Sequence, residues 1–171
     1  MGPNRTTTKI LLLLRHAKSS WKDESLSDFD RPLNERGKKA AQAIGRYIKK
    51  QKIMPDLVLS SPAVRARETT GIITTSAKLT AEIRYDQRIY EADSLRLVHI
   101  LSQIEDNFCS VLLVGHNPGI EELLGLLTGS SQHMPTAALA KIRLEGVDDW
   151  SEISQAKSIL ELMIKPKDIT E

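Results

Sequence analysis

Arginine and histidine recur where three apolar runs of this sequence end. Arg15 and His16 directly follow the first run, Arg65 stands about one helical turn beyond the second, and the last run leads into His116. One guanidinium group can bind two oxygens of a phosphate at the same time. A neutral imidazole can attack phosphorus while nearby cations offset the charge on the phosphate. If the fold brings these four side chains together, they predict a site that binds a phosphate dianion and can transfer it.

The same apolar runs predict how these side chains meet. Residues 9–14, 57–60 and 110–115 are continuous and largely apolar, which is typical of strands buried on both faces of a parallel sheet. In an open parallel sheet, ligands bind at the carboxyl ends of the strands. The residues that follow each run are therefore expected to line one crevice.

Helices must cover both faces of such a sheet, and four segments have the caps and apolar spacing of helices. They are residues 34–50 with Asn34 as cap, 61–77 opening at Ser61 and Pro62, 94–105 with Ser94 as cap, and 117–128 opening at Asn117 and Pro118. Residues 139–144 alternate as a half-exposed edge strand does, and residues 150–164 indicate one or two short strands. The sequence thus predicts an α/β fold with a mostly parallel sheet.

The size of the chain favours one domain, residues 1–171. Its mass of 19.1 kDa suits a single hydrophobic core, and only residues 1–8 and 166–171 look like loose ends. With 24 basic and 22 acidic residues, the net charge of +2 is too balanced to predict nucleic-acid binding. The longest apolar run, residues 10–14, is too short for a membrane span, so we expect no membrane association.

The cysteine and histidine positions indicate the cellular compartment and whether a metal is needed. Cys109 is the only cysteine and lies in an apolar stretch, which predicts a buried thiol in a reducing compartment, with the cytoplasm as the default. No histidine or cysteine pair has the spacing of a metal site, so we expect neither a metal nor another cofactor. His99 and His133 lack a strand-end setting and are interpreted as solvated or structural.

Three separated motifs resemble the histidine phosphatase superfamily, and most closely its short SixA-type phosphohistidine phosphatases. They are residues 14–17 (Leu-Arg-His-Ala), 61–69 and 115–118 (Gly-His-Asn-Pro), and the resemblance extends over about residues 9–144. It implies a three-layer αβα sandwich of the phosphoglycerate-mutase type, with His16 as the phosphorylated nucleophile. It also implies a phosphate pocket made by Arg15, Arg65 and His116, with Asn117 as a further substrate-binding residue.

Lys18, Glu91 and Arg65 are the positions at which the comparison with the family pattern is least direct. Where the family commonly has Arg-His-Gly-Glu, this chain has Ala17 and Lys18, which adds a cation at the rim and makes Lys18 a candidate substrate-binding residue. Glu91 stands at the place of the family's catalytic acid. Glu91 could equally be an exposed glutamate that precedes a helix and has no catalytic role. Arg65 fits the family pattern Arg-Ala-x-x-Thr, whereas the helical period puts Arg67 about 200° away from it.

The resemblance also implies an open site, because no large lid insertion is present. An open site suits a phosphorylated side chain on another protein, so we expect removal of phosphate from phosphohistidine, on a histidine phosphotransfer domain or a phosphocarrier. Two alternatives are a phosphatase of a small phosphomonoester or phospholipid head group, and a phosphate-binding module without turnover. Lys18 and Lys22, beside Trp21, could steer an acidic partner, or form a solvated basic loop.

Overall fold

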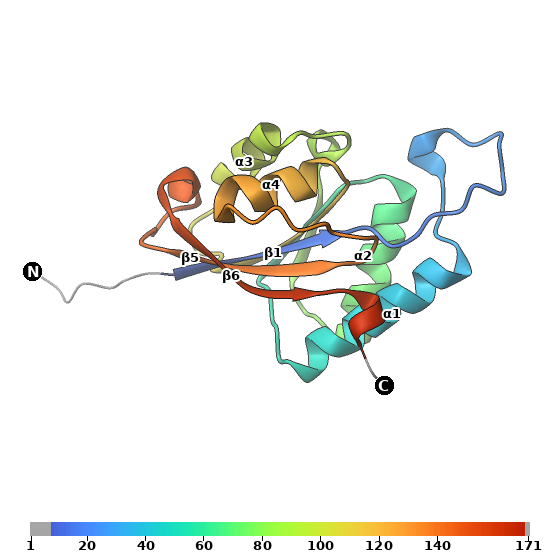
Figure 1. The fold of residues 1–171 in the computed structure, drawn as a ribbon, viewed down its shortest axis with the longest axis horizontal. Coiled ribbons are helices and arrows are strands. Elements are labelled where there is room, and N and C mark those ends of the chain that lie inside the picture. The colour runs from blue at the N-terminus through green and yellow to red at the C-terminus, as the bar shows by residue number, and fades with distance from the viewer. Residues whose placement is uncertain (1–7, 170–171) are drawn as a thin grey trace, which may run out of the picture.

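A single twisted sheet organises the computed structural model, which describes residues 8–169 (Figure 1). Its strands are β1 (Thr8–Arg15), β2 (Leu57–Ser60), β3 (Glu82–Tyr85), β4 (Ser110–Gly115), β5 (Leu139–Glu145) and β6 (Lys157–Ile164). Their order across the sheet is β3-β2-β4-β1-β5-β6. Strands β1 to β4 run parallel, whereas β5 pairs antiparallel with both β1 and β6. The expected mostly parallel α/β sheet is confirmed.

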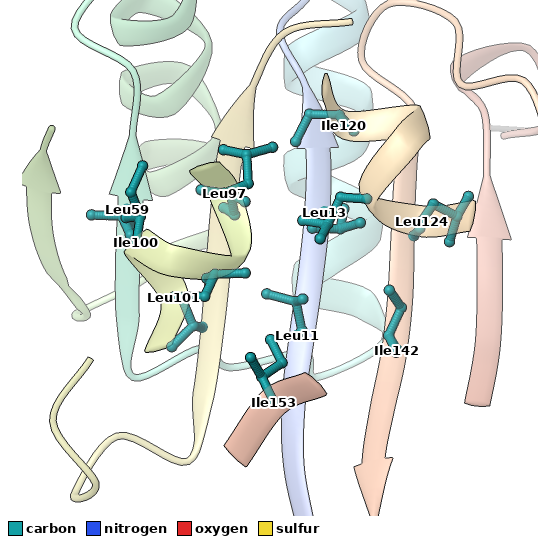
Figure 2. Packing of buried hydrophobic residues seen from close by; sticks show 14 of the residues in the cluster. Leu11, Leu13, Leu59, Leu97, Ile100, Leu101, Ile120, Leu124, Ile142 and Ile153 are labelled. Carbon is teal, nitrogen blue, oxygen red and sulfur yellow. The ribbon is translucent and has the colours of Figure 1, made fainter. Parts of the chain in front are cut away.

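Two helices cover each face of this sheet. Helices α1 (Glu35–Lys50) and α2 (Val64–Ala77) lie on one face, and α3 (Ser94–Ser102) and α4 (Gly119–Thr128) lie on the other (Figure 1). Because successive side chains of a strand point to opposite faces, β1 contributes to two cores. Leu12 and Leu14 are buried on the α1 and α2 side, whereas Leu11 and Leu13 pack below α3 and α4 (Figure 2). The three-layer αβα arrangement is therefore confirmed.

Two helices, α2 and α4, begin later than their caps suggested, and α3 begins one residue earlier. Helix α2 starts at Val64, because the Ser61 hydroxyl accepts from the Ala63 N–H and also bonds to a histidine of the site. Asp93, one residue before the expected Ser94, caps α3 by accepting from the Arg96 N–H, and this helix ends at Ser102. Helix α4 starts at Gly119, whereas α1 is capped by Asn34 as expected.

The C-terminal part of the chain corrects two expectations. The strand expected at the edge, β5, lies inside the sheet, because residues 157–164 form a full strand beside it. Its alternating pattern reflects one covered and one partly exposed face, which any strand near the end of a helical layer can have. Residues 150–155 are a 3-10 helix, and Pro166–Asp168, expected to be loose, form another.

Two expectations about single residues and ends also change. Thr8 belongs to β1, and the remainder of the expected N-terminal loose end lies outside the described residues. Cys109 is exposed, contrary to the expected buried thiol, because it stands in the loop directly before β4 and not within the buried strand. Between residues 8 and 169, no helix is both long and apolar enough to span a membrane.

Two glycines allow loops to approach the helices that carry the candidate site. A Cβ at Gly37, in the first turn of α1, would overlap the backbone of Lys18, and a Cβ at Gly119 would overlap the Ala92 carbonyl oxygen. Asn34 reinforces the first contact, since its N–H donates to the Lys18 carbonyl (3.0 Å). The loops after β1 and before α3 are thus held against the start of α1 and α4.

Candidate active site

The carboxyl ends of β1, β2 and β4 meet at one edge of the sheet, as expected for a ligand site in a parallel sheet. A hollow of about 470 Å³ opens there. Its lining includes Asp28, Arg65, Tyr90, Glu91, His116 and Asn117. Residues from four separate segments of the chain therefore share one pocket.

His16 is 7% exposed and is not part of this lining, but it contacts Arg65 and His116, which are. Its Nδ1 lies 2.7 Å from the Ala17 carbonyl, and a carbonyl only accepts, so Nδ1 carries the proton. Its Nε2 is then an acceptor, and the Arg65 Nε donates to it (3.3 Å). Burial lowers the pKa of His16 to about 4, and the positive charges of Arg65 and Arg15 act in the same direction. The imidazole is neutral at pH 7 with a lone pair on Nε2.

Arg65 is the central cation of the pocket and is also 7% exposed. Besides its bond to His16, it donates through Nη1 to the Asp28 carbonyl (2.6 Å) and through Nη2 to the Asp28 carboxylate (3.0 Å). Arg67, by contrast, is exposed and stacks on the Tyr85 ring. A guanidinium has five N–H donors, so two of those on Arg65 remain for a phosphate. Arg65 therefore faces the pocket, whereas Arg67 faces away from it.

His116 stands opposite His16, with 5.0 Å between their ring centroids. Its Nε2 shares a hydrogen bond with the Ser61 hydroxyl (2.7 Å), and its Nδ1 has no partner in the described part of the chain. Its pKa falls to about 3, mainly because it is buried, and His16 and Arg65 contribute to the fall. Both histidines of the site are therefore neutral in the physiological range.

Arg15 and Asn117 are both tied to the loop after α4. The Nη1 of Arg15 donates to the Met134 carbonyl (3.1 Å), and the Asn117 amide donates to the same carbonyl (3.0 Å). Asn117 also donates to the Glu121 carboxylate (2.9 Å), which leaves its own carbonyl oxygen without a partner among the described residues. Arg15 thus has spare donors toward the site, whereas the amide hydrogens of Asn117 are already used.

Glu91 and Lys18 differ in where they lie. Glu91 lines the pocket, is exposed, and has a left-handed backbone with φ of 59°, a conformation that is uncommon for a residue with a side chain. Lys18 is exposed but does not line this pocket, and it is its backbone that packs on α1. The structure brings Glu91 to the pocket with Arg65 and His116, and leaves Lys18 outside the lining.

Asp28 and Tyr90 are two of the pocket residues that the sequence did not single out. The Asp28 carboxylate binds Arg65, Arg31 (2.9 Å) and the Tyr90 hydroxyl (2.6 Å). The bond from Tyr90 does most to hold the pKa of Asp28 down, at about 2, and the two arginines add to it. The ring of Tyr90 packs edge-on against His116, with centroids 5.5 Å apart.

The arrangement can bind and transfer a phosphoryl group. The His16 imidazole is neutral, and its Nε2 lies beside the Arg65 guanidinium, so a phosphate that takes over the Arg65 donors would lie next to the nitrogen that attacks it. Over residues 8–169, no group of three or more histidine, cysteine or acidic side chains is placed to hold a metal ion. The arginines and histidines of the site can themselves offset charge on a phosphate.

Comparison with known proteins identifies the family. Residues 11–96 match the Histidine phosphatase superfamily (branch 1). An uncharacterised chloroplastic protein of Arabidopsis thaliana is 31% identical over 160 residues, covering 88% of this chain and 73% of that protein.

Two solved structures extend this likeness to the whole fold. A protein from Agrobacterium tumefaciens, assigned as the phosphohistidine phosphatase SixA, is 32% identical with a TM-score of 0.78, over 92% of this chain and 98% of its own. One from Nakamurella multipartitia with the same assignment is 25% identical with a TM-score of 0.81, over 93% of this chain and 96% of its own. The chain therefore belongs to branch 1 of the histidine phosphatase superfamily, and its structure is of the SixA type.

Proposed function

We propose that this protein is a phosphohistidine phosphatase that acts on another protein through a covalent intermediate on His16. The observation that carries the proposal is the tautomer of His16: the bond from Nδ1 to the Ala17 carbonyl leaves the Nε2 lone pair facing Arg65. The likeness to two proteins assigned as SixA supports the choice of substrate. The single cysteine, which excludes a disulfide within these 171 residues, favours a cytoplasmic location.

The reaction proceeds in two displacements at phosphorus. The His16 Nε2 attacks the phosphorus of the substrate, whose imidazole has taken a proton from solvent on its other ring nitrogen. The bond from phosphorus to that imidazole breaks, and the imidazole leaves in its neutral form with the electron pair. Arg15, Arg65 and His116 hold the three equatorial oxygens, where charge accumulates. Water then attacks the phosphorus on His16, inorganic phosphate leaves, and His16 regains its neutral form.

An exposed mouth favours a protein substrate over an enclosed small molecule. Asp28, Glu91 and other residues around the pocket are exposed, so a side chain carried by a protein can reach His16 from outside. Phosphohistidine also places a modest demand on the site, because its imidazole can be protonated before the bond breaks. An alkyl phosphate expels a poor leaving group, for which a carboxylic acid at Glu91 would contribute roughly 10²- to 10⁴-fold.

Two substrates and one variant test this function. With a phosphohistidine peptide, Glu91→Gln should reduce kcat/KM by less than about tenfold, and with an alkyl phosphate by roughly 10²-fold or more. The wild-type protein should prefer the phosphohistidine peptide. Efficient turnover of alkyl phosphates alone would assign the protein to the small phosphomonoester class, and turnover of neither substrate would favour a phosphate-binding module.

Chelation tests the proposal that no metal takes part. The charge on the phosphoryl group is offset by arginine and histidine, so EDTA should leave kcat unchanged. Loss of activity in EDTA that returns with magnesium would contradict this part of the mechanism.

A further inference from the structure

The mouth of the pocket is lined by carboxylates, in contrast to its cationic floor. Glu91 and Asp93 lie in the loop before α3, and Glu122 lies in the first turn of α4, so two different elements contribute them. All three are exposed. On the floor, His116 is nine-tenths buried and lines the same pocket with its Nδ1 unpartnered, which marks the hollow as a place for a ligand.

These carboxylates are not used within the protein as ion-pair partners. Over residues 8–169, no lysine, arginine or histidine forms an ion pair with Glu91, Asp93 or Glu122. The neighbouring Glu121 behaves differently, since it pairs with His133 and accepts from the Asn117 amide and the Met134 N–H. Asp93 caps α3, and the negative charge of Glu122 stabilises the N-terminus of α4. Neither of these structural roles explains why Glu91 adds a third unpaired carboxylate to the same rim.

An acidic rim repels a phosphate that approaches the site, and positive charge on the ligand removes this repulsion. A free phosphate dianion that approaches His16 passes three negative charges, which lower its affinity. A substrate that carries positive charge beside its phosphoryl group loses this penalty and gains attraction instead. The rim therefore discriminates between phosphorylated ligands by the charge of what surrounds the phosphate.

We propose that Glu91, Asp93 and Glu122 select a phosphorylated protein segment in which basic side chains flank the phosphorylated residue. This inference rests on the proposed function and names the kind of partner that the site takes. It places the charges that attract the partner at the start of α3 and α4, and because these charges are negative, the partner must be basic. The earlier expectation, in which Lys18 and Lys22 attract the partner, requires an acidic partner instead.

Three phosphohistidine peptides that differ only in their flanking residues test this inference. One carries lysines, one serines and one glutamates. At low ionic strength, wild-type kcat/KM should be roughly tenfold higher for the lysine peptide than for the glutamate peptide, with the serine peptide between them. Added salt should reduce the difference, because exposed charges are screened.

The variant Asp93→Asn with Glu122→Gln separates recognition from a damaged fold. Asparagine still caps a helix, and both changes keep the side-chain size. The variant should turn over the lysine peptide about threefold more slowly and the glutamate peptide faster, whereas a structural defect would slow both. A matched control, Asp148→Asn with Glu152→Gln, removes the same charge away from the pocket and should leave the ratio as in the wild type.

Each outcome decides between the two proposals. Equal wild-type rates on the three peptides, or a preference for glutamate flanks, would overturn the basic partner and leave the phosphohistidine activity standing. A ratio that falls equally in the control variant would overturn the assignment to this rim. Failure to hydrolyse any phosphohistidine peptide, with an aryl phosphate still turned over, would overturn the proposed function and this inference together.

Discussion

At the scale of single residues, the state of His16 is set by what surrounds it. Burial is the main reason that its pKa falls to about 4, and Arg65 and Arg15 lower it further. The Ala17 carbonyl acts in the opposite direction, yet it also fixes the proton on Nδ1. One backbone contact therefore orients the imidazole, while burial, helped by the nearby cations, keeps it unprotonated.

Titration of His16 should reflect this environment. We expect its imidazole to stay neutral from pH 7 down to about pH 5 and to take up a proton with a midpoint near 4. The Cε1–H resonance in a proton–carbon NMR spectrum, assigned by its absence from His16→Asn, measures this directly. A midpoint near the ordinary histidine value, about 6.5, would mean that the site is wetter than its geometry implies.

The two arginines of α2 should differ strongly in their effect on turnover. Arg65→Ala removes the donor to His16 and a cation of the pocket, so kcat should fall roughly 10³-fold or more. Arg67→Ala, one of the exposed positions on the same helix, should change kcat by less than about threefold. Single-turnover rates on a phosphohistidine peptide measure both, and a larger loss in Arg67→Ala would show that the phosphate is bound elsewhere.

At the scale of elements, the site depends on how closely two loops approach their helices. Gly119 begins α4 against the Ala92 carbonyl, and Ala92 follows Glu91, whose backbone is left-handed. This contact places the loop before α3 beside the residues that follow β4. The geometry of the acidic rim therefore depends on a glycine that has no side chain in the pocket.

Gly119→Ala should displace this loop. Because a Cβ would meet backbone that cannot rotate away, we expect a loss of stability of roughly 1–3 kcal/mol and a fall in kcat/KM. Gly71→Ala in α2 is the matched control, since a Cβ there meets nothing within 4 Å, and alanine should stabilise that helix by about 0.5–1 kcal/mol. Urea unfolding measures both, and equal effects would contradict the role given to Gly119.

The sequence predicted the elements with a clear apolar pattern and the residues that directly follow them, but it did not predict contacts between loops. The buried strands β1, β2 and β4 were identified from continuous apolar runs, and their ends located Arg15, His16 and His116. Strand β3 was not delimited, because its residues are exposed or half-buried and carry no apolar run.

Asp28 shows the same limit within the site. It lies far from Arg65 and Tyr90 in the sequence, in an exposed and polar loop without a periodic pattern. Its role depends on the path of that loop across the pocket. Ser61 was predicted as a cap for a similar reason: the sequence shows a serine before a helix, but not the histidine that its hydroxyl meets.

At the scale of the whole molecule, the two buried histidines couple stability to pH. Their folded pKa values of about 4 and about 3 lie below the unfolded value near 6.5, so the unfolded chain binds more protons between these limits. The free energy of unfolding should therefore fall as the pH drops from about 6.5 to about 4, by an amount on the order of a few kcal/mol. The depressed pKa of Asp28 acts only below about pH 4.

Urea denaturation at a series of pH values measures this coupling. Replacing both histidines, His16→Asn with His116→Asn, should flatten the dependence between about pH 4 and pH 6.5, because the groups that bind the extra protons on unfolding are gone. An unchanged slope in the double variant would show that other groups control acid sensitivity.

The covalent state of His16 during turnover is the most direct test of the whole account. The protein is mixed with excess phosphohistidine peptide, quenched rapidly without acid, and digested for mass spectrometry. We predict one phosphoryl group on His16, formed and lost at rates compatible with kcat, and neither label nor turnover in His16→Ala. Phosphate found instead on Asp28, Ser19 or Ser61, with His16→Ala still active, would contradict it.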